Sequence, residues 1–345
     1  MREIEVILGN SNKRFSGVTS TMLATLPGVA ERCEVAVLGA HFVPKGVRVI
    51  GFIEMIKISR KPLIDGKWRV FHARRNDEMI QALISKQLFG AKLKIIFTST
   101  AQRNHSRFTK FLMGKMDGIL STCQAAADYL EPPPDEIIPH GVNLEEFYPA
   151  PSRDTLWKSL GHGGEFGIGA FGRVRPSKGT DLLVRAAIPL LKADLRLTVI
   201  IIGETTSKYQ AFQADLQSEI DAAGLTDRIL FLGKLPFSEV KRYFRGVSLV
   251  TALSRNEGFG LTVLEAMASG ASVIATKAGA WAEILAHQPN SIVPEYSVDQ
   301  VKQTLMQKLT ISDLKSEGKA NHHYVSENYS ITNEVDKLCD YYLRE

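Results

Sequence analysis

The sequence predicts an α/β protein of two domains, each built on a parallel sheet covered by helices on both faces. The chain has 345 residues, of which 44% are hydrophobic, so it is long enough to bury two ordinary cores. Short apolar segments alternate with helical segments through the second half, which is typical of a doubly wound parallel sheet. Residues 150–165, rich in Pro, Ser and Gly, separate the halves. We therefore predict an N-terminal domain over 1–150 and a C-terminal domain over 151–330.

In the first half, apolar runs bounded by turn residues predict strands, and helical spacing predicts the helices between them. The strands are expected at 4–8, 35–38, 47–52, 68–71, 93–97, 117–121 and 136–139, and the main helices from 18, over 77–89 and over 107–116. The last of these helices is expected to be amphipathic. Its inward side chains would be Phe108, Phe111 and Leu112, and its basic side chains would face solvent or lipid headgroups.

In the second half, the same reasoning predicts regular alternation of strand and helix. Strands are expected at 166–171, 195–202, 229–232, 247–253 and 272–275, and helices over 180–193, 207–223 and 238–244. A helix-rich tail follows from residue 298. Glycine or polar residues follow several of these strands, at the carboxyl edge where open α/β sheets bind their ligands.

The net charge of +5 is unevenly distributed along the chain. Residues 1–150 carry 20 Lys and Arg against 15 Asp and Glu, whereas residues 151–345 are balanced. Between Glu78 and Asp117 there is no acid, and there are these basic residues: Lys86, Lys92, Lys94, Arg103, Arg107, Lys110 and Lys115. This stretch could face an anionic membrane or an anionic acceptor, or it could be a solvated helix surface. No nucleic-acid-binding motif accompanies it, which disfavours a nucleic-acid partner.

The N-terminal residues and the cysteine content indicate a cytoplasmic protein. The first nine residues are interrupted by charges and do not resemble a signal peptide, and no stretch approaches the length of a membrane span. Cys33, Cys123 and Cys339 are far apart and lack metal-ligand spacing, so we expect reduced structural thiols.

The most informative stretch is Arg255–Gly270, which reads as a strand end, a glycine turn and the start of a helix. Helix starts bind anions such as a diphosphate, and Gly258 and Gly260 would let one approach the backbone closely. The carboxylates of Glu257 and Glu265 would instead accept hydrogen bonds from hydroxyls. Together these features indicate a nucleotide sugar. The alternative is a capping box formed by Thr262 and Glu265, with Glu257 as a solvated loop acid.

A second stretch, residues 166–181, opens a buried strand into a turn that carries Arg173 and Lys178. The planar Arg fork and the point charge of Lys suit the oxygens of a diphosphate. We expect these two cations and the helix start to stabilise the negative charge that develops on a leaving diphosphate. With this positive charge available and no D-x-D pair near a strand end, no metal or other cofactor is expected.

The two stretches together resemble the signature of retaining GT-B glycosyltransferases, the large family four. The residues concerned are G-R-x-x-P-x-K-G at 172–179 and E-G-F-G-L-T-x-L-E-A-M-A-x-G at 257–270, about eighty residues apart. The resemblance implies two Rossmann-like domains facing a central cleft, with the donor in the second domain and the acceptor against the first. It also implies that the last helix, within 331–345, crosses back to the first domain.

The resemblance further assigns roles in donor binding. Glu257 would bind sugar hydroxyls, and Glu265 would reach back over the turn to the ribose hydroxyls. Lys234 and Leu235 would line the base pocket, and Gly17 would lie near the donor phosphates. The complete set of expected donor-binding residues is Gly17, Gly203, Lys234, Leu235, Gly258, Phe259, Gly260, Leu261, Thr262 and Glu265.

On the acceptor side we expect His72, Arg74, Ser99 and Arg103, because they follow strands at a carboxyl edge. For His72 and Arg74 the alternative is a turn, with Asn76 capping the next helix. Relatives often place a histidine after the strand at 93–97 to contact the transferred sugar. This chain has Thr98 and Ser99 there, and His105 is the candidate for that role.

The first half also resembles bacterial lipopolysaccharide core mannosyltransferases, in W-R-V-F-H-A-R-R-N-D-E-M, I-I-F-T-S-T-A-Q-R-N-H-S and I-I-P-H-G-V-N. This resemblance implies GDP-mannose as the donor and a lipid-linked, anionic core oligosaccharide as the acceptor, handled peripherally at the cytoplasmic face of the inner membrane. Three alternatives remain: a glycosyltransferase that uses a UDP-sugar, a sugar-nucleotide epimerase of this fold, and a non-catalytic nucleotide- or RNA-binding protein.

Overall fold

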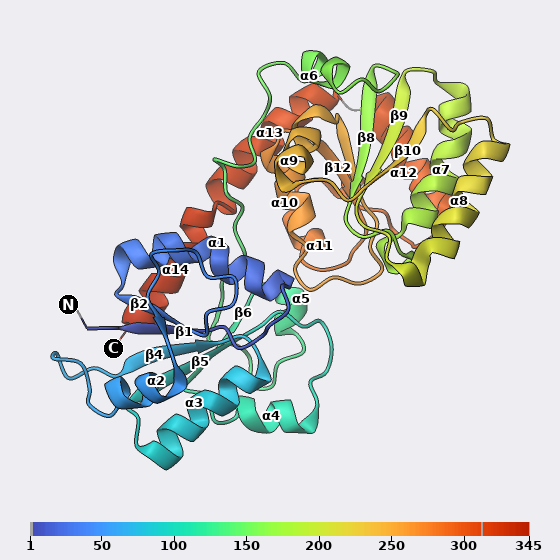
Figure 1. Cartoon of the computed structure of the whole chain (residues 1–345). Helices are drawn as coiled ribbons and strands as arrows, with labels where there is room; N and C mark the ends of the chain where they lie inside the picture. The colour runs from blue at the N-terminus through green and yellow to red at the C-terminus, as the bar shows by residue number, and fades with distance from the viewer. Residues whose placement is uncertain (1–2, 312, 345) are drawn as a thin grey trace. The chain divides into compact units, whose positions relative to one another are not determined.

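The computed structural model describes residues 3–311 and 313–344, and the chain divides into two compact units (Figure 1). Unit 1 comprises Met1–Gly141 and Ile331–Glu345, and unit 2 comprises Val142–Ser330. The composition of the chain suggested a boundary at residue 150, but the units divide earlier, after Gly141. The physical reason is that Phe147 packs edge-on against Phe237 and Phe244 of unit 2.

Unit 1 is built on a seven-stranded sheet in which every pair of neighbouring strands is parallel. Its strands are β1 (Val6–Gly9), β2 (Val35–Leu38), β3 (Val49–Ile50), β4 (Arg69–Ala73), β5 (Leu93–Ser99), β6 (Gly118–Ser121) and β7 (Glu136–Ile137). Their order is β3-β2-β1-β4-β5-β6-β7. The order reverses between β1 and β4, and such a switch point opens a crevice at the carboxyl edge.

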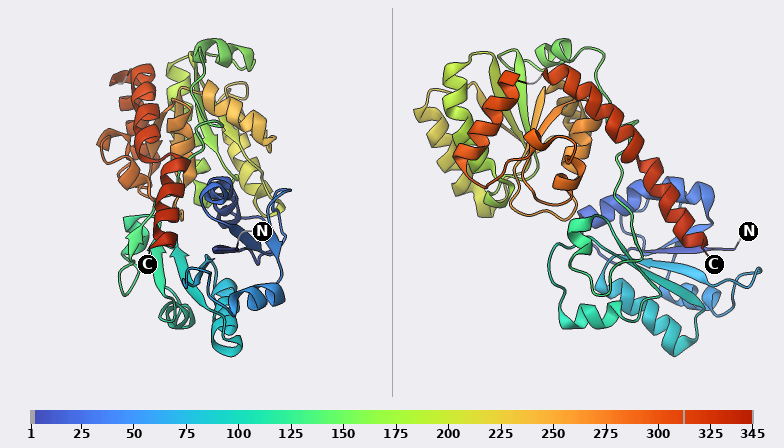
Figure 2. Two further views of the ribbon diagram at one scale, coloured as in Figure 1. Left: turned by 90° about the vertical axis from the view of Figure 1, so that its left-hand side faces the viewer. Right: turned by 180° about the vertical axis from the view of Figure 1, so that it is seen from behind.

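Helices cover both faces of this sheet. The helices are α1 (Gly17–Arg32), α2 (Phe52–Ser59), α3 (Asn76–Phe89), α4 (Arg107–Met113), α5 (Gln124–Ala127) and α14 (Ile331–Leu343). On one face, α1 and the C-terminal helix α14 lie side by side and share a core with the sheet (Figures 1 and 2). On the other face, α2, α3 and α4 contribute a second core cluster. Both ends of the chain therefore contribute to unit 1.

Two expectations for unit 1 were wrong. Phe108 and Phe111 of α4 point outward and are 55% and 61% exposed, while Thr109, Leu112 and Met113 face the core. Thr109 faces inward because its hydroxyl accepts a hydrogen bond from Nδ2 of Asn76 at 2.9 Å. Asn76 does not cap α3 either: it is the first residue of the helix, and Arg75 occupies the N-cap position.

Unit 2 contains a five-stranded parallel sheet with the order β10-β9-β8-β11-β12. The strands are β8 (Phe166–Phe171), β9 (Leu197–Ile202), β10 (Ile229–Gly233), β11 (Leu249–Ala252) and β12 (Ser272–Ala275). They agree closely with the five predicted strands. The order reverses between β8 and β11, which defines the switch point of this sheet.

The helices of unit 2 bury the sheet on both sides. They are α6 (Arg153–Ser159), α7 (Thr180–Ala193), α8 (Gln210–Ala222), α9 (Phe237–Gly246), α10 (Leu261–Ala268), α11 (Trp281–Ile284), α12 (Val298–Ile311) and α13 (Leu314–Asn328), with short 3-10 turns η1 (Pro176–Lys178), η2 (Ser207–Tyr209) and η3 (Pro289–Ser291). Helices α7, α8 and α12 share the core of one face, and α10 packs between the sheet and α13 on the other. Strands β8 and β11 are interior neighbours in this sheet, and the loops that follow them meet at its carboxyl edge.

Candidate active site

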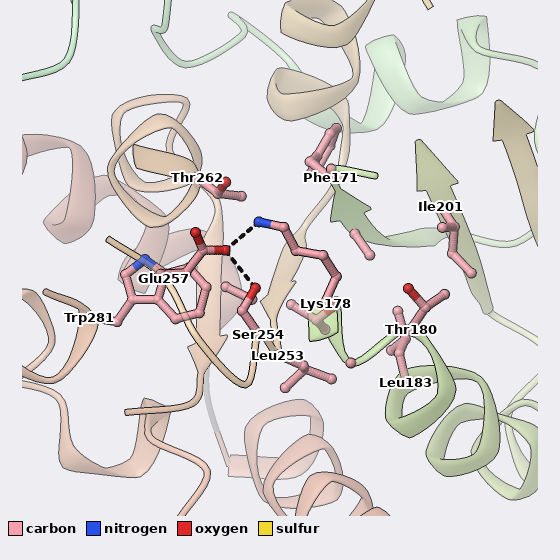
Figure 3. A pocket seen from close by; sticks show the side chains of 15 residues that line it. Phe171, Lys178, Thr180, Leu183, Ile201, Leu253, Ser254, Glu257, Thr262 and Trp281 are labelled. Atoms are coloured by element: carbon pink, nitrogen blue, oxygen red, sulfur yellow. Dashed lines mark hydrogen bonds and ion pairs between the residues drawn. The ribbon is translucent and has the colours of Figure 1, made fainter. Parts of the chain in front are cut away.

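A pocket opens at the switch point of unit 2, where the chain leaves β8 and β11 (Figure 3). The two loops are tied together: the backbone N–H of Arg255 donates to the carbonyl of Ser177 at 2.9 Å. Gly179 has φ +70°, and a Cβ there would lie 2.1 Å from the carbonyl oxygen of Leu253. Only glycine therefore allows the two loops to approach this closely.

Within the pocket, the structure brings Lys178 and Glu257 into direct contact. The Lys178 Nζ forms an ion pair with Oε1 of Glu257, and the Ser254 hydroxyl donates to the same oxygen at 2.7 Å (Figure 3). The side chains of Lys178 and Glu257 are 22% and 17% exposed, whereas Ser254 is buried. The pair is partly desolvated but still accessible to a ligand. A ligand could therefore reach both side chains and replace their ion pair with its own contacts.

Helix α10 begins at the edge of the same pocket. Its N-cap is Gly260 at φ +88°, with no side-chain cap. Thr262 lies inside the helix and lines the pocket, so the capping box considered from the sequence does not form. The first turn of an α-helix leaves backbone N–H groups without intrahelical partners and favours anions. The start of α10 is thus a suitable place for a phosphate beside Lys178.

The buried Trp281 packs against this glycine turn. Its Nε1 donates to the carbonyl of Gly260 at 2.7 Å, and a Cβ on Gly260 would lie 2.4 Å from that nitrogen. The next loop contributes as well, because the backbone N–H of Ala280 donates to the carbonyl of Phe259 at 2.9 Å. The conformation of the turn is therefore fixed by contacts from the segment that follows β12.

Glu265 lies in α10, with its side chain partly exposed. Burial among protein atoms is the main reason that its pKa is raised to about 7; Glu146 adds to this shift and Lys178 opposes it. Burial therefore favours the protonated form of this carboxyl group. Such a group can accept a hydrogen bond from a hydroxyl or donate one, which fits a ligand that carries hydroxyls.

The remaining expected donor residues lie along the same carboxyl edge. Arg173 is exposed just after β8, and Lys234 and Leu235 follow β10. Gly203 follows β9 directly, and its N–H donates to the carbonyl of Gly233 at 2.8 Å. A Cβ on Gly203 would lie 1.9 Å from the carbonyl oxygen of Gly172, so the adjoining loops touch here. The edge forms a continuous row from β10 to β11 that could hold an elongated ligand.

The expected acceptor-side residues of unit 1 do not all lie at a surface. His72 is fully buried, with Nδ1 2.6 Å from the Tyr342 hydroxyl and Nε2 2.7 Å from Oγ1 of Thr98. Burial, and then the nearby Arg74 and His140, hold the pKa of His72 well below its usual range. Its position does not fit the expected contact with an acceptor: His72 anchors α14 to the sheet.

Other residues of unit 1 remain near the carboxyl edge. The Ser99 hydroxyl lies 3.0 Å from Nε2 of His105, and burial followed by Arg103 and Lys110 lowers the pKa of His105. Arg103 is exposed, and Arg74 is partly buried, with its Nη1 atom enclosed. Ser99 and His105 thus form a pair, which the sequence did not foresee.

Gly17 starts α1, behind the N-cap Ser16. A Cβ at Gly17 would meet no atom within 4 Å, so packing alone does not require glycine there.

Known proteins match this chain over most of its length. Residues 165–310 match the family described as "Glycosyl transferases group 1". The lipopolysaccharide core biosynthesis mannosyltransferase LpcC of Rhizobium leguminosarum is 41% identical over 286 residues, which cover 83% of this chain and 80% of LpcC. LpsB of Rhizobium meliloti, described by the same function, is 39% identical over 290 residues, with the same coverage. The chain belongs to the group 1 glycosyltransferases.

The fold of this glycosyltransferase agrees with that assignment. The structure of Anabaena HepE in complex with UDP superimposes with a TM-score of 0.80 at 17% identity, covering 98% of this chain and 99% of HepE. Two parallel-sheet α/β units of this kind constitute the GT-B fold, as the sequence predicted. The chain is therefore related to enzymes, and these matches do not support the alternative of a non-catalytic binding protein.

Sequence reasoning missed three features of this glycosyltransferase. Ser254 and Trp281 hold Glu257 and Gly260, but nothing in their local sequence signals these contacts. In unit 1, Glu78 is fully buried at the switch point, where Oε2 accepts the Arg74 N–H at 2.7 Å and Oε1 accepts Nη1 of Arg75 at 2.9 Å. Glu78 therefore lies between the loops that follow β1 and β4, where its carboxylate accepts from the N–H groups of Ser11 and Arg74.

Residues 3–311 and 313–344 contain no group of three or more His, Cys, Asp or Glu side chains placed to hold a metal ion. In the same ranges, no helix combines the length and the apolar character needed to cross a membrane.

Proposed function

We propose that this glycosyltransferase transfers mannose from GDP-mannose, with retention of anomeric configuration and without a metal ion, to a lipid-linked anionic oligosaccharide of the lipopolysaccharide core. The enzyme would work peripherally at the cytoplasmic face of the inner membrane. The main support is the Lys178–Glu257 pair at the start of α10, in a chain 41% identical to a lipopolysaccharide core mannosyltransferase.

The geometry of unit 2 suits a nucleoside-diphosphate sugar. The base would lie beside Lys234 and Leu235, the diphosphate between Arg173, Lys178 and the start of α10, and the sugar against Glu257. Donor binding would break the resting ion pair, so that Lys178 turns to phosphate oxygens and Glu257 to sugar hydroxyls. Because the negative charge on the diphosphate grows as the anomeric bond breaks, Lys178 would stabilise the transition state more than the bound donor.

The reaction balances without a covalent enzyme intermediate. The bond between the anomeric carbon and the diphosphate oxygen breaks, and its electron pair stays with GDP. The acceptor oxygen forms a new bond to the anomeric carbon on the same face, and the acceptor proton passes to the departing phosphate oxygen. The enzyme's contribution is orientation and electrostatic stabilisation by groups already in place.

The acceptor would be recognised by unit 1. Arg74, Arg103 and His105 follow β4 and β5 at the carboxyl edge, and they offer cations and a hydrogen-bonding group to an anionic saccharide. Ser99, the last residue of β5, is buried, which does not fit the expected acceptor contact; it would instead orient His105. The basic stretch from Lys86 to Lys115 would add long-range attraction toward an anionic lipid-linked substrate. The His105 imidazole is the candidate for contact with the transferred sugar.

The deciding experiment measures nucleoside diphosphate release from a panel of GDP- and UDP-sugars in the presence of EDTA. The panel is run first without acceptor and then with extracted core oligosaccharide. We expect selective release of GDP from GDP-mannose, stimulated by the oligosaccharide. The Lys178→Ala variant should lose this release, whereas Lys192→Ala, which removes an exposed lysine at the end of α7, should retain it.

Each other outcome would reject a specific part of the proposal. Release of UDP from a UDP-sugar would show that the donor is not GDP-mannose. Formation of an epimerised sugar nucleotide would show that the reaction is epimerisation and not transfer. Activity that EDTA abolishes and Mg²⁺ restores would reject the metal-free mechanism. No release from any donor, together with no donor binding by calorimetry, would reject the function.

A further inference from the structure

The outward face of α4 in unit 1 combines two aromatic side chains with basic ones. Phe108 and Phe111 are 55% and 61% exposed and stand three residues apart, so they share one side of the helix. Arg107 and Lys110 are exposed on the same short helix, and Lys115 follows it, with Nζ 5.7 Å from the centre of the Phe111 ring. A purely solvated helix face accounts for the lysines but not for two large exposed phenyl rings.

The neighbouring helix α3 extends this character. It covers the same face of the sheet as α4 (Figures 1 and 2), and it ends in Leu88, which is 76% exposed, and Phe89, which is 41% exposed. Two acids from outside the two helices pair with basic residues of this region. Asp117 pairs with Lys86 at 2.6 Å, and Glu131 lies 3.6 Å from Lys110. Positive charge still dominates, since residues 79–116 contain seven Lys and Arg and no Asp or Glu.

We propose that the exposed face of α4, formed by Arg107, Phe108, Lys110 and Phe111 together with Lys115, docks on an anionic lipid bilayer. The two phenyl rings would enter the boundary between headgroups and acyl chains, while the basic groups contact lipid phosphates. This inference deepens the proposed function, because it names the surface that would bring a peripheral enzyme to a lipid-linked acceptor.

The occupant is a bilayer and not a folded protein for two reasons. The face belongs to a helix of seven residues, which is too small to provide the area that a stable protein interface buries. Its charge is of one sign over a long stretch, which complements an extended anionic surface better than the mixed charges of a typical protein.

The test is co-sedimentation of the full chain with vesicles of phosphatidylglycerol and phosphatidylethanolamine, compared with vesicles of phosphatidylcholine alone. We expect binding to the anionic vesicles that weakens at high salt, and little binding to phosphatidylcholine. The variants Phe108→Ser/Phe111→Ser and Lys110→Glu/Lys115→Glu should each lower the partition coefficient at least about tenfold. Circular dichroism should stay unchanged, because the altered side chains lie outside the core.

Matched changes in unit 2 provide the controls. Leu195 is 77% exposed and Lys192 is exposed, so Leu195→Ser and Lys192→Glu remove an exposed apolar side chain and a positive charge elsewhere. Both should bind vesicles as the unaltered protein does. The proposal is wrong if the α4 variants also bind normally. It is also wrong if the unaltered protein does not bind anionic vesicles, or binds anionic and phosphatidylcholine vesicles equally.

Vesicle binding and GDP release are measured separately, so the docking surface and the proposed function can fail independently. GDP release from GDP-mannose, measured without acceptor and without lipid, should be the same in the Phe108→Ser/Phe111→Ser variant and the unaltered protein. If the unaltered protein binds anionic vesicles but releases no GDP, then the proposed function fails and the docking surface stands.

Discussion

The two units build the same kind of sheet but use its switch point differently. In unit 2, the crevice between β8 and β11 is an accessible pocket in which Lys178 and Glu257 are each about one-fifth exposed. In unit 1, the crevice between β1 and β4 is filled by Glu78, which is completely buried and linked to Arg75. A charged pair thus lies in an accessible pocket in one unit and is mostly buried in the other.

The surfaces differ in a complementary way. Unit 1 has 22 basic against 17 acidic residues, and unit 2 has 20 of each. Most of the exposed large apolar side chains also belong to unit 1, among them Ile64, Phe108 and Phe111. Unit 1 therefore carries the excess positive charge and most of the exposed large apolar side chains, whereas unit 2 carries the pocket that is proposed to bind the donor.

The largest effect is expected for Lys178→Ala, which removes the cation of the unit 2 pocket. We expect the turnover number for donor cleavage to fall about 10²–10³-fold, because Lys178 acts on charge that develops in the transition state. Lys178→Arg, which retains the charge, should recover part of the rate. Unchanged turnover with only a higher KM for the donor would contradict this role.

A smaller but measurable effect is expected for Glu78→Gln in unit 1. The change leaves the guanidinium of Arg75, whose side chain is 15% exposed, without its carboxylate, and should lower the free energy of unfolding by about 3 kcal/mol. Asp77→Asn removes an exposed neighbouring acid and should change stability by less than about 1 kcal/mol. Urea denaturation measures both. A large rise in donor KM for Glu78→Gln, without loss of stability, would break the contrast between the units.

The pH dependence of stability tests the carboxyl group of Glu265 in α10. Its pKa is raised from 4.5 to about 7 in the folded protein, so between these values the folded state holds a proton that the unfolded state has lost. The stabilisation is fully present below pH 4.5 and is lost as the pH rises through 7, by about 3 kcal/mol in total. Compared with the unaltered protein, Glu265→Gln should lack this loss in urea denaturation at pH 5 and pH 8. Parallel stability profiles would show that Glu265 is not held in a desolvated site.

The smallest effect is expected for Trp281→Phe, which retains the ring but removes the donor to the carbonyl of Gly260. Loss of one hydrogen bond of about 1 kcal/mol should raise the donor KM about fivefold. Trp157→Phe is the matched control, because Trp157 is equally buried and donates to the carbonyl of Gly164 at 3.2 Å. It should lose similar stability without a change in KM. Equal donor KM values for both variants would show that the Trp281 hydrogen bond does not support the glycine turn at the donor site.

Much of unit 2 was predictable, since its five strands are apolar runs separated by helical spacing and its pocket residues lie in two local motifs. Lys178 and Glu257 were expected to lie close together, and they are in contact because the carboxyl ends of β8 and β11 meet at the same edge. Their direct ion pair, and the support from Ser254 and Trp281, could not be predicted because these contacts depend on how three loops pack.

Unit 1 was less predictable because long-range contacts decide it. The segment Arg107–Met113 offers two stripes of similar spacing, and the hydrogen bond from Asn76 to Thr109 selects the one that leaves Phe108 exposed. His72 ends a strand like a ligand-binding residue, but Tyr342, which lies 270 positions later, covers it. No local pattern contains that information.

The most direct test of the difference between the units is a crystal structure of the protein with GDP-mannose. We expect the diphosphate at the carboxyl edge of unit 2, within hydrogen-bonding distance of Lys178 and the first backbone N–H groups of α10, with Lys178 no longer paired to Glu257. A donor bound instead at the β1–β4 edge of unit 1, or a diphosphate bound in unit 2 while the Lys178–Glu257 pair stays intact, would contradict the account.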